Sequence, residues 1–131
     1  MKVALGLGCD RDTPIATVVR AIDEALAEAG VTLADVAAVA TIDRKSDEVA
    51  FIELAKEHDW TMIHYRAEEL AGVPVPHPSE VVMKYVGTPS VAEAAALLAA
   101  GTNADGLLVE KHKHKGDDGK HATVSVARMS Q

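Results

Sequence analysis

The fold is decided by the stretch Lys2-Val3-Ala4-Leu5-Gly6-Leu7-Gly8, an apolar run that a short polar segment separates from Thr13-Pro14. Such a run is typical of a buried strand in a sheet covered on both faces. After Pro14, apolar residues recur at helical spacing until Gly30; they are Ile15, Val18, Val19, Ile22 and Leu26. The stretch therefore predicts a β-loop-α unit, the repeating element of an α/β fold.

The next segment repeats this form. Val36 to Ile42 is a second apolar run, and Ser46 is the expected N-cap of a helix that ends at His58. Trp60 to Tyr65 predicts a third strand, and Ala67 to Ala71 a short helical turn. Two successive units of the same kind favour a parallel sheet with helical connections.

The remaining chain completes the fold. Val73 to Pro78 indicates a proline-broken linker, and Glu80 to Tyr85 fits a strand or, as we favour, a short helix. Ser90 and Glu93 form a capping-box pattern before an alanine-rich helix that ends at Ala100. We expect a C-terminal antiparallel hairpin, with strands at Leu107 to Val109 and Ala122 to Ala127 around a turn at Gly116 to Gly119. The prediction is one domain, residues 1–131, with a three-layer α/β/α fold and a mainly parallel sheet.

Composition fits this fold. The chain has 131 residues, of which 48% are hydrophobic and only 3% aromatic, so Val, Leu, Ile and Ala must build the core. Cys9 is the single cysteine, which excludes an intramolecular disulfide. No apolar run approaches the roughly 20 residues of a membrane span, and the N-terminus lacks the h-region of a signal peptide. We therefore expect a soluble, cytoplasmic protein with no membrane partner.

The formal charge of −7 restricts the partners. Proteins that neutralise phosphates carry a basic face, so broad nucleic-acid binding is not expected. An acidic protein that binds an anion must gather its positive charges locally.

The first candidate site is the glycine-rich loop after the first strand, since ligands of open α/β sheets bind outside the carboxyl ends of the strands. Gly6 and Gly8 predict a tight turn, the helix N-terminus after it favours an anion, and Arg11 adds a forked donor. A plain strand-to-helix turn would also explain the glycines.

Cys9 is interpreted as shaping this loop. The alternative is a nucleophile activated by the helix start, but no histidine that could act as its base lies nearby in sequence.

The second candidate site is the charged loop after the second strand. Lys45 suits a substrate carboxylate, while Asp43 or Glu48 could position water or move a proton. The alternative is a solvated loop with helix-capping acids.

A third candidate is the run Lys111-His112-Lys113-His114-Lys115, because alternation in a strand separates a lysine row from a histidine row. The lysine row suits an acidic ligand, and His121 is expected nearby across the hairpin. Two histidines alone do not make a metal site, and spacing provides no third ligand, so no metal is expected.

Five segments in order resemble the family of the CbiG C-terminal domain and the stand-alone CobE protein of cobalamin biosynthesis. They are Gly6 to Arg11, Thr41 to Lys45, Ser79 to Val82, Gly87 to Ala94 and Leu107 to Lys113. The first loop departs from the family pattern, because Asp10 replaces a basic residue and Asp12 the usual glycine, and His77 replaces a common asparagine.

The resemblance implies an anionic corrinoid or precorrin intermediate as ligand, with the domain acting as carrier or accessory factor and needing no cofactor. The alternative is a cobalt-precorrin-5A hydrolase that opens the ring-A lactone and releases acetaldehyde, with catalysis by Asp43, Lys45 and Glu48. Assembly with other cobalamin-biosynthesis enzymes and a homodimer both stay open. The candidate substrate-binding residues are Gly6, Gly8, Cys9, Arg11, Lys45, Ser79, Glu80, Lys84, Gly87, Thr88, Ser90, Lys111 and Lys113.

Overall fold

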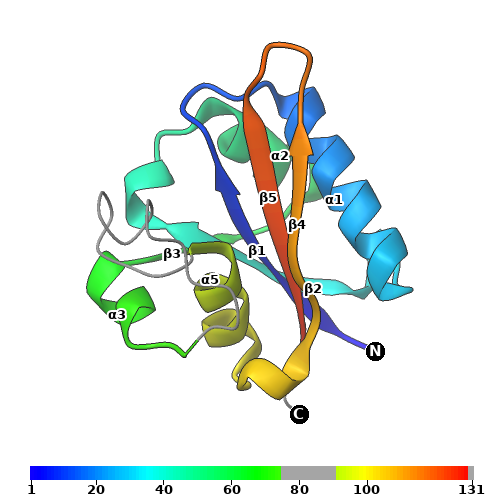
Figure 1. The fold of residues 1–131 in the computed structure, drawn as a ribbon, viewed down its shortest axis with the longest axis vertical. Coiled ribbons are helices and arrows are strands. Elements are labelled where there is room, and N and C mark those ends of the chain that lie inside the picture. Colours follow the sequence, from blue (N-terminus) through cyan, green and yellow to red (C-terminus); the bar gives the residue numbers. More distant parts are fainter. Residues whose placement is uncertain (75–90, 130–131) are drawn as a thin grey trace.

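The computed structural model describes residues 1–74 and 91–129. They form a five-stranded sheet in the order β3-β2-β1-β5-β4, with helices on both faces (Figure 1). The predicted three-layer α/β/α class is confirmed. The elements are β1 Val3–Cys9, α1 Ile15–Ala29, η1 Leu33–Asp35, β2 Val36–Ile42, η2 Asp43–Lys45, α2 Val49–His58, β3 Met62–Tyr65, α3 Ala67–Ala71, α5 Val91–Ala100, η3 Ala104–Gly106, β4 Leu107–Lys115 and β5 His121–Arg128.

Strand direction follows the predicted pattern. β1 pairs in parallel with β2, and β2 in parallel with β3. β5 pairs antiparallel with both β1 and β4, so β4 runs in the same direction as the first three strands. Among the described strands only β5 is reversed, as expected for a mainly parallel sheet that ends in an antiparallel hairpin.

The two faces of the sheet are filled by side chains of different size. Val3, Leu5 and Leu7 of β1 pack with α1 and α2 in the largest cluster, which also contains Phe51. On the opposite face, Ala4 packs with Ala96, Leu97 and Ala100 of α5. Figure 1 shows α5 in front of the sheet and α2 behind it. Alternating large and small residues along β1 thus set two different helix-to-sheet distances.

Gly6 explains how α5 comes so close. A Cβ atom at Gly6 would overlap the carbonyl oxygen of Ala92 and lie 2.6 Å from the amide nitrogen of Ala96. Ala4 lies instead in the cluster that contains Ala100. α5 therefore runs antiparallel to β1, and its N-terminus lies toward the carboxyl ends of the parallel strands.

Several sequence predictions need correction. Gly6 and Gly8 do not form a tight turn; they lie within β1, paired with Ser125 and Thr123 of β5. Ser46 is not the N-cap of α2, because the intervening turn η2 moves that position to Glu48.

Other boundaries need smaller changes. β4 is longer than predicted and continues to Lys115. Gly30 ends α1 with a left-handed φ of 74°, as predicted. The segment predicted over Glu80 to Tyr85 lies outside the described residues. Within the described parts of the chain, no helix is long and apolar enough to span a membrane.

Candidate functional site

The candidate site lies at the carboxyl edge of the sheet, where several chain segments converge. β1 ends at Cys9 and β2 at Ile42, and their two following loops lie side by side. The antiparallel strand β5 begins at this edge, and the backbone N–H of His121 donates to the Asp10 carboxylate at 2.8 Å. The N-terminus of α5 points the same way, which adds a partial positive charge.

Glu48 joins the two loops. Its carboxylate accepts a hydrogen bond from the Asp12 backbone N–H at 3.0 Å and lies 3.5 Å from both Arg11 and Lys45. Its side chain is 1% exposed, whereas that of Arg11 is 52% exposed. A buried acid thus holds two cations at the rim of the sheet, and three of the predicted site residues come together there.

Asp12 has an unusual backbone for its residue type. Its φ is 61°, in the left-handed region that favours glycine and that aspartate tolerates better than most residues. The loop thus holds a glycine-like backbone conformation at an aspartate. The shape matters, since it aims the Asp12 N–H at Glu48.

Asp47 was not predicted as a site residue, yet it makes the shortest contacts of the cluster. Arg11 donates to its two carboxylate oxygens at 2.7 and 2.9 Å. The Arg11 guanidinium holds the pKa of the Asp47 carboxyl below its usual value, and Asp47 in turn raises the pKa of Arg11. The mixed-charge run after Ile42, with acids at residues 43, 47 and 48, was the available signal, but sequence alone does not say which acid faces Arg11. Asp43 is exposed.

Cys9 lies beside this cluster as a protonated thiol. Burial raises its pKa to about 11 from 9.0, and nearby Lys45 offsets only part of that effect. The alternative of an activated nucleophile is therefore not supported, because the thiolate is the reactive form.

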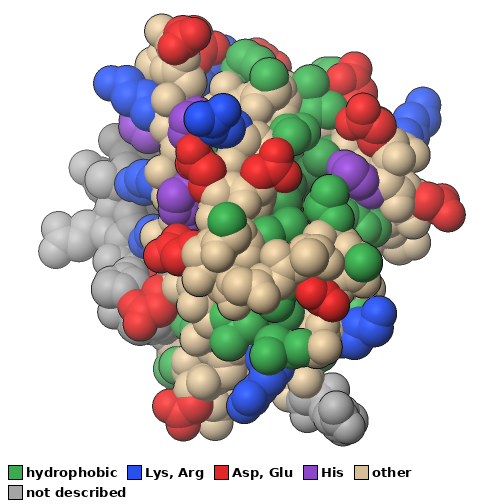
Figure 2. Space-filling view, turned by 90° about the vertical axis from the view of Figure 1, so that its right-hand side faces the viewer, with side chains coloured by type: hydrophobic (Ala, Val, Ile, Leu, Met, Phe, Trp, Pro, Cys, Tyr) green, Lys and Arg blue, Asp and Glu red, His purple; other side chains and the backbone are tan. Residues whose placement is uncertain are grey.

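The histidine and lysine rows of β4 separate as predicted. His112 Nε2 lies 2.8 Å from Glu24 of α1, and His114 Nδ1 lies 3.2 Å from the same carboxylate. Lys111 instead reaches α5, with its Nζ 3.9 Å from Glu93. On the face that carries α1, histidine side chains lie beside acidic ones (Figure 2). Within residues 1–74 and 91–129, no group of three or more His, Cys, Asp or Glu side chains is arranged to hold a metal ion.

Glu93 was predicted only as a helix-capping residue. Its side chain is 0% exposed, in the first turn of α5. The sequence pattern does not indicate this burial, because a glutamate three residues after a serine is the ordinary capping pattern.

Lys113 is exposed on β4. The remaining predicted residues lie outside the described parts of the chain; they are Ser79, Glu80, Lys84, Gly87, Thr88 and Ser90.

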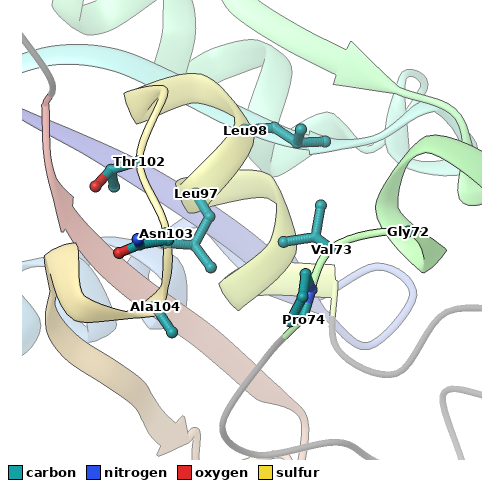
Figure 3. A pocket seen from close by; sticks show the side chains of 8 residues that line it. All are labelled: Gly72, Val73, Pro74, Leu97, Leu98, Thr102, Asn103 and Ala104. Carbon is teal, nitrogen blue, oxygen red and sulfur yellow. The ribbon is translucent and has the colours of Figure 1, made fainter.

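Two hollows lie away from this edge. One, of about 250 Å³, opens beside the C-terminal end of α5 and is lined by Val73, Leu97 and Asn103 among others (Figure 3). It is smaller than the roughly 300 Å³ at which drug-sized ligand pockets begin. The other is a shallow groove between Val19 of α1 and Lys56 of α2. Neither contains a predicted site residue.

The fold and the site define a small α/β domain with a cluster of paired charges at the carboxyl edge of its sheet, built from strand-end loops. The chain belongs to the family described as "Cobalamin synthesis G C-terminus", which matches residues 3–127. The predicted resemblance is thereby confirmed.

Two curated relatives support this assignment. The chain is 36% identical over 125 residues to a cobalt-precorrin-5A hydrolase of Priestia megaterium, covering 95% of this chain and 32% of that protein. It thus spans about a third of that relative. It is also 37% identical over 132 residues to the protein CobE of Sinorhizobium sp, covering 95% of this chain and 79% of that protein.

Solved structures agree. A crystal structure of CobE, a protein from the cobalamin biosynthetic pathway, superimposes with a TM-score of 0.78 at 28% identity, covering 98% of this chain and 91% of that one. The cobalamin biosynthesis protein chiG from Agrobacterium tumefaciens gives 0.66 at 28% identity, covering 98% and 99%. The chain therefore belongs to a family of cobalamin biosynthesis.

Proposed function

We propose that this domain binds an anionic corrin-ring intermediate of cobalamin biosynthesis at the carboxyl edge of its sheet, and that it holds or delivers that intermediate. One observation carries the proposal. Arg11 and Lys45 project from adjacent strand ends at the edge toward which the N-terminus of α5 points. Both cations are paired with carboxylates of the same loops, so an anionic ligand would bind them in exchange for Asp47 and Glu48, with the N-terminus of α5 adding a partial positive charge.

The spread of these groups fits a large, flat polyanion. Corrin intermediates carry acetate and propionate side chains around a macrocycle, so their charges lie far apart. Arg11 and Lys45 lie after the ends of β1 and β2. Lys111 and Lys113 of β4 add positive charge on the side of the sheet that faces α5. In this proposal Ser79, Glu80, Lys84, Gly87, Thr88 and Ser90 contribute further contacts, while Gly6 and Gly8 contribute by shaping β1.

A titration tests the proposal. The probe is cobyrinic acid, a stable corrin with free carboxylates, and binding is followed by its visible absorbance. We expect saturable binding to the wild type and about tenfold weaker binding for each of Lys45→Ala and Lys111→Ala, which corresponds to about 1.4 kcal/mol. Lys2→Ala removes the same charge just before β1, at the opposite edge of the sheet, and should leave the affinity unchanged.

Specificity for carboxylates is tested with cobinamide, a corrin whose side chains are amidated. Weak or absent binding of cobinamide would support recognition of the charged groups. Equal binding of the two corrins would contradict the proposal. No binding of cobyrinic acid at low salt would also contradict it, because the attraction between carboxylates and solvent-accessible cations is strongest at low ionic strength.

Similarity to the hydrolase of Priestia megaterium favours a second candidate, hydrolysis of a ring lactone. In that case Lys45 would stabilise the developing oxyanion, and the exposed Asp43 would position water more readily than Glu48, whose carboxylate already accepts from Asp12 and faces two cations. Incubation with cobalt-precorrin-5A and an acetaldehyde assay test it. Product release that is lost in Lys45→Ala and Asp43→Ala would establish this function, and binding without product would exclude it.

A further inference from the structure

Glu93 is the most unusual charged residue of the described chain. It lies in the first turn of α5, and its side chain is 0% exposed. The neighbouring residues of the helix are alanines, and Ala92 packs directly on Gly6 of β1. A carboxylate in such a place is costly unless charges or hydrogen bonds compensate it, so its presence calls for a function.

Helix capping does not explain this burial. Two other short helical elements begin with a capping box whose acid is Asp35 or Glu69. Asp35 is partly exposed and Glu69 is exposed, yet both accept the backbone hydrogen bonds of their N-caps. A capping acid can therefore do its work at the surface of this protein, so capping alone does not require the burial of Glu93.

Lys111 is a charged partner of Glu93. Its ammonium group lies 3.9 Å from the Glu93 carboxylate, and its side chain is still 21% exposed. One end of the pair is thus buried under α5, while the other reaches solvent in the middle of β4, beside the first turn of α5. A lysine held in this way loses fewer rotamers on binding an anion than a free surface lysine does.

A bulge in β4 directs Lys111 to this face. The register with β5 shifts between Val109 and His112, and the hydroxyl of the fully buried Ser125 donates to the Glu110 carbonyl at 2.6 Å. Bulges change the direction of side chains. Here the shift allows Lys111 to face α5 while His112 faces α1.

We propose that Glu93 is a positioning residue, whose buried carboxylate holds the Lys111 ammonium group in place for the anionic ligand. This inference rests on the binding site proposed above. Glu93 does not touch the ligand; it acts through Lys111, and Ser125 supports the pair by fixing the bulge.

Ligand-free NMR tests the positioning itself. In isotope-labelled wild type, the two ε-methylene protons of Lys111 should be inequivalent and should show fast transverse relaxation, because the side chain has a fixed direction. Glu93→Gln should make them equivalent and slow their transverse relaxation, as for the mobile side chain expected at the exposed Lys115, which serves as the internal reference. An unchanged Lys111 signal in a folded Glu93→Gln variant would overturn the proposal whether or not any corrin binds.

The affinity for cobyrinic acid distinguishes positioning from simple electrostatics, because the two predict changes of opposite sign. Glu93→Gln removes a negative charge, so electrostatics alone predicts tighter binding of cobyrinic acid. Positioning predicts about fivefold to tenfold weaker binding in Glu93→Gln, and almost no further effect of that change when Lys111 is already methionine. Tighter binding, or an equal loss in the Lys111→Met background, would contradict the role.

A second variant covers the case in which Glu93→Gln does not fold. Ser125→Ala removes the hydroxyl that fixes the bulge and keeps every charge. We expect it to loosen the Lys111 signal and to weaken cobyrinic acid binding by a few fold. If Ser125→Ala leaves both the Lys111 signal and the affinity unchanged, the bulge does not aim Lys111 and the proposal fails.

Discussion

The two faces of the sheet are built in different ways. Toward α1 and α2, side chains such as Leu5, Ile22 and Phe51 fill a thick layer. Toward α5, the sheet and the helix meet through Ala4, Gly6 and alanines of the helix. A layer of large side chains can shift rotamers when a residue is substituted. Where the backbone of α5 packs against the backbone of β1, no such adjustment is possible.

The charged groups follow the same division. On the α2 side, Glu48 lies at a helix start and satisfies a backbone N–H and two cations at the rim. On the α5 side, Glu93 lies beneath a closely packed helix and faces Lys111. Glu48 therefore holds the backbone of the first loop in place, whereas Glu93 holds the side chain of Lys111.

The largest expected effect comes from breaking the close approach at Gly6. Gly6→Ala places a methyl group against the backbone of α5, which has no rotamer with which to move away. We expect a loss of about 3 kcal/mol or more in the free energy of unfolding, measured by urea denaturation.

Gly8→Ala is the matched control. A Cβ at Gly8 lies 3.9 Å from the nearest atom, on Thr123, and should change stability by less than about 1 kcal/mol. Equal losses for the two variants would show that the glycines serve strand flexibility and not helix contact.

The next effect concerns Glu48. Glu48→Ala leaves the Asp12 N–H without its acceptor and two cations without their buried partner, so we expect a loss of about 2–3 kcal/mol in thermal or urea unfolding. Asp47→Ala removes another acid from the same Arg11, but an exposed one, and should cost no more than about 1 kcal/mol. A larger loss for Asp47→Ala would reverse the assigned roles.

Cys9 provides a chemical probe of the α2 side. Since its pKa is raised to about 11 from 9.0, the thiolate fraction at pH 8 should be about a hundredfold lower than for an unperturbed thiol. Alkylation by iodoacetamide, followed by mass spectrometry, should be correspondingly slow and should accelerate up to about pH 11. Rapid alkylation at pH 8 would contradict the buried, protonated thiol.

The smallest effect is expected where β4 meets α1. His112, and then Arg20, hold the pKa of Glu24 below its ordinary 4.5. The stabilisation is therefore present above pH 4.5 and is lost as the pH falls through the lowered pKa. We expect Glu24→Gln to be slightly less stable at pH 7 and to lose less stability on acidification. The exposed Glu53→Gln serves as the control, and parallel pH profiles for Glu24→Gln and wild type would contradict the linkage.

Much of the fold was predictable from local pattern. Val36 to Ile42 and Ala67 to Ala71 match the predicted ranges, because apolar runs and helix formers act locally. The misplaced N-cap of α2 arose because Ser46 lies in a turn that no periodicity marks. The prediction for Gly6 was wrong because the sequence does not distinguish a glycine that allows close packing of a helix from a glycine that forms a turn.

The site was predictable in part. Spacing after each strand placed Arg11, Lys45 and Glu48 at one edge, and the structure brings them together. The roles of Asp47 and Glu93 depend on long-range packing, which brings residue 47 to residue 11 and residue 93 to residue 111. No local signal encodes such pairs.

The most direct test of the central claim is an amide NMR titration of isotope-labelled protein with cobyrinic acid. The account predicts saturable chemical-shift changes at residues 10–13 and 45–48, after the ends of β1 and β2, at residues 91–93 in the first turn of α5 and at residues 111–113 of β4, and none around the hollow lined by Val73 and Asn103. Shifts confined to that hollow or to the groove between α1 and α2, or no shifts at all, would contradict it.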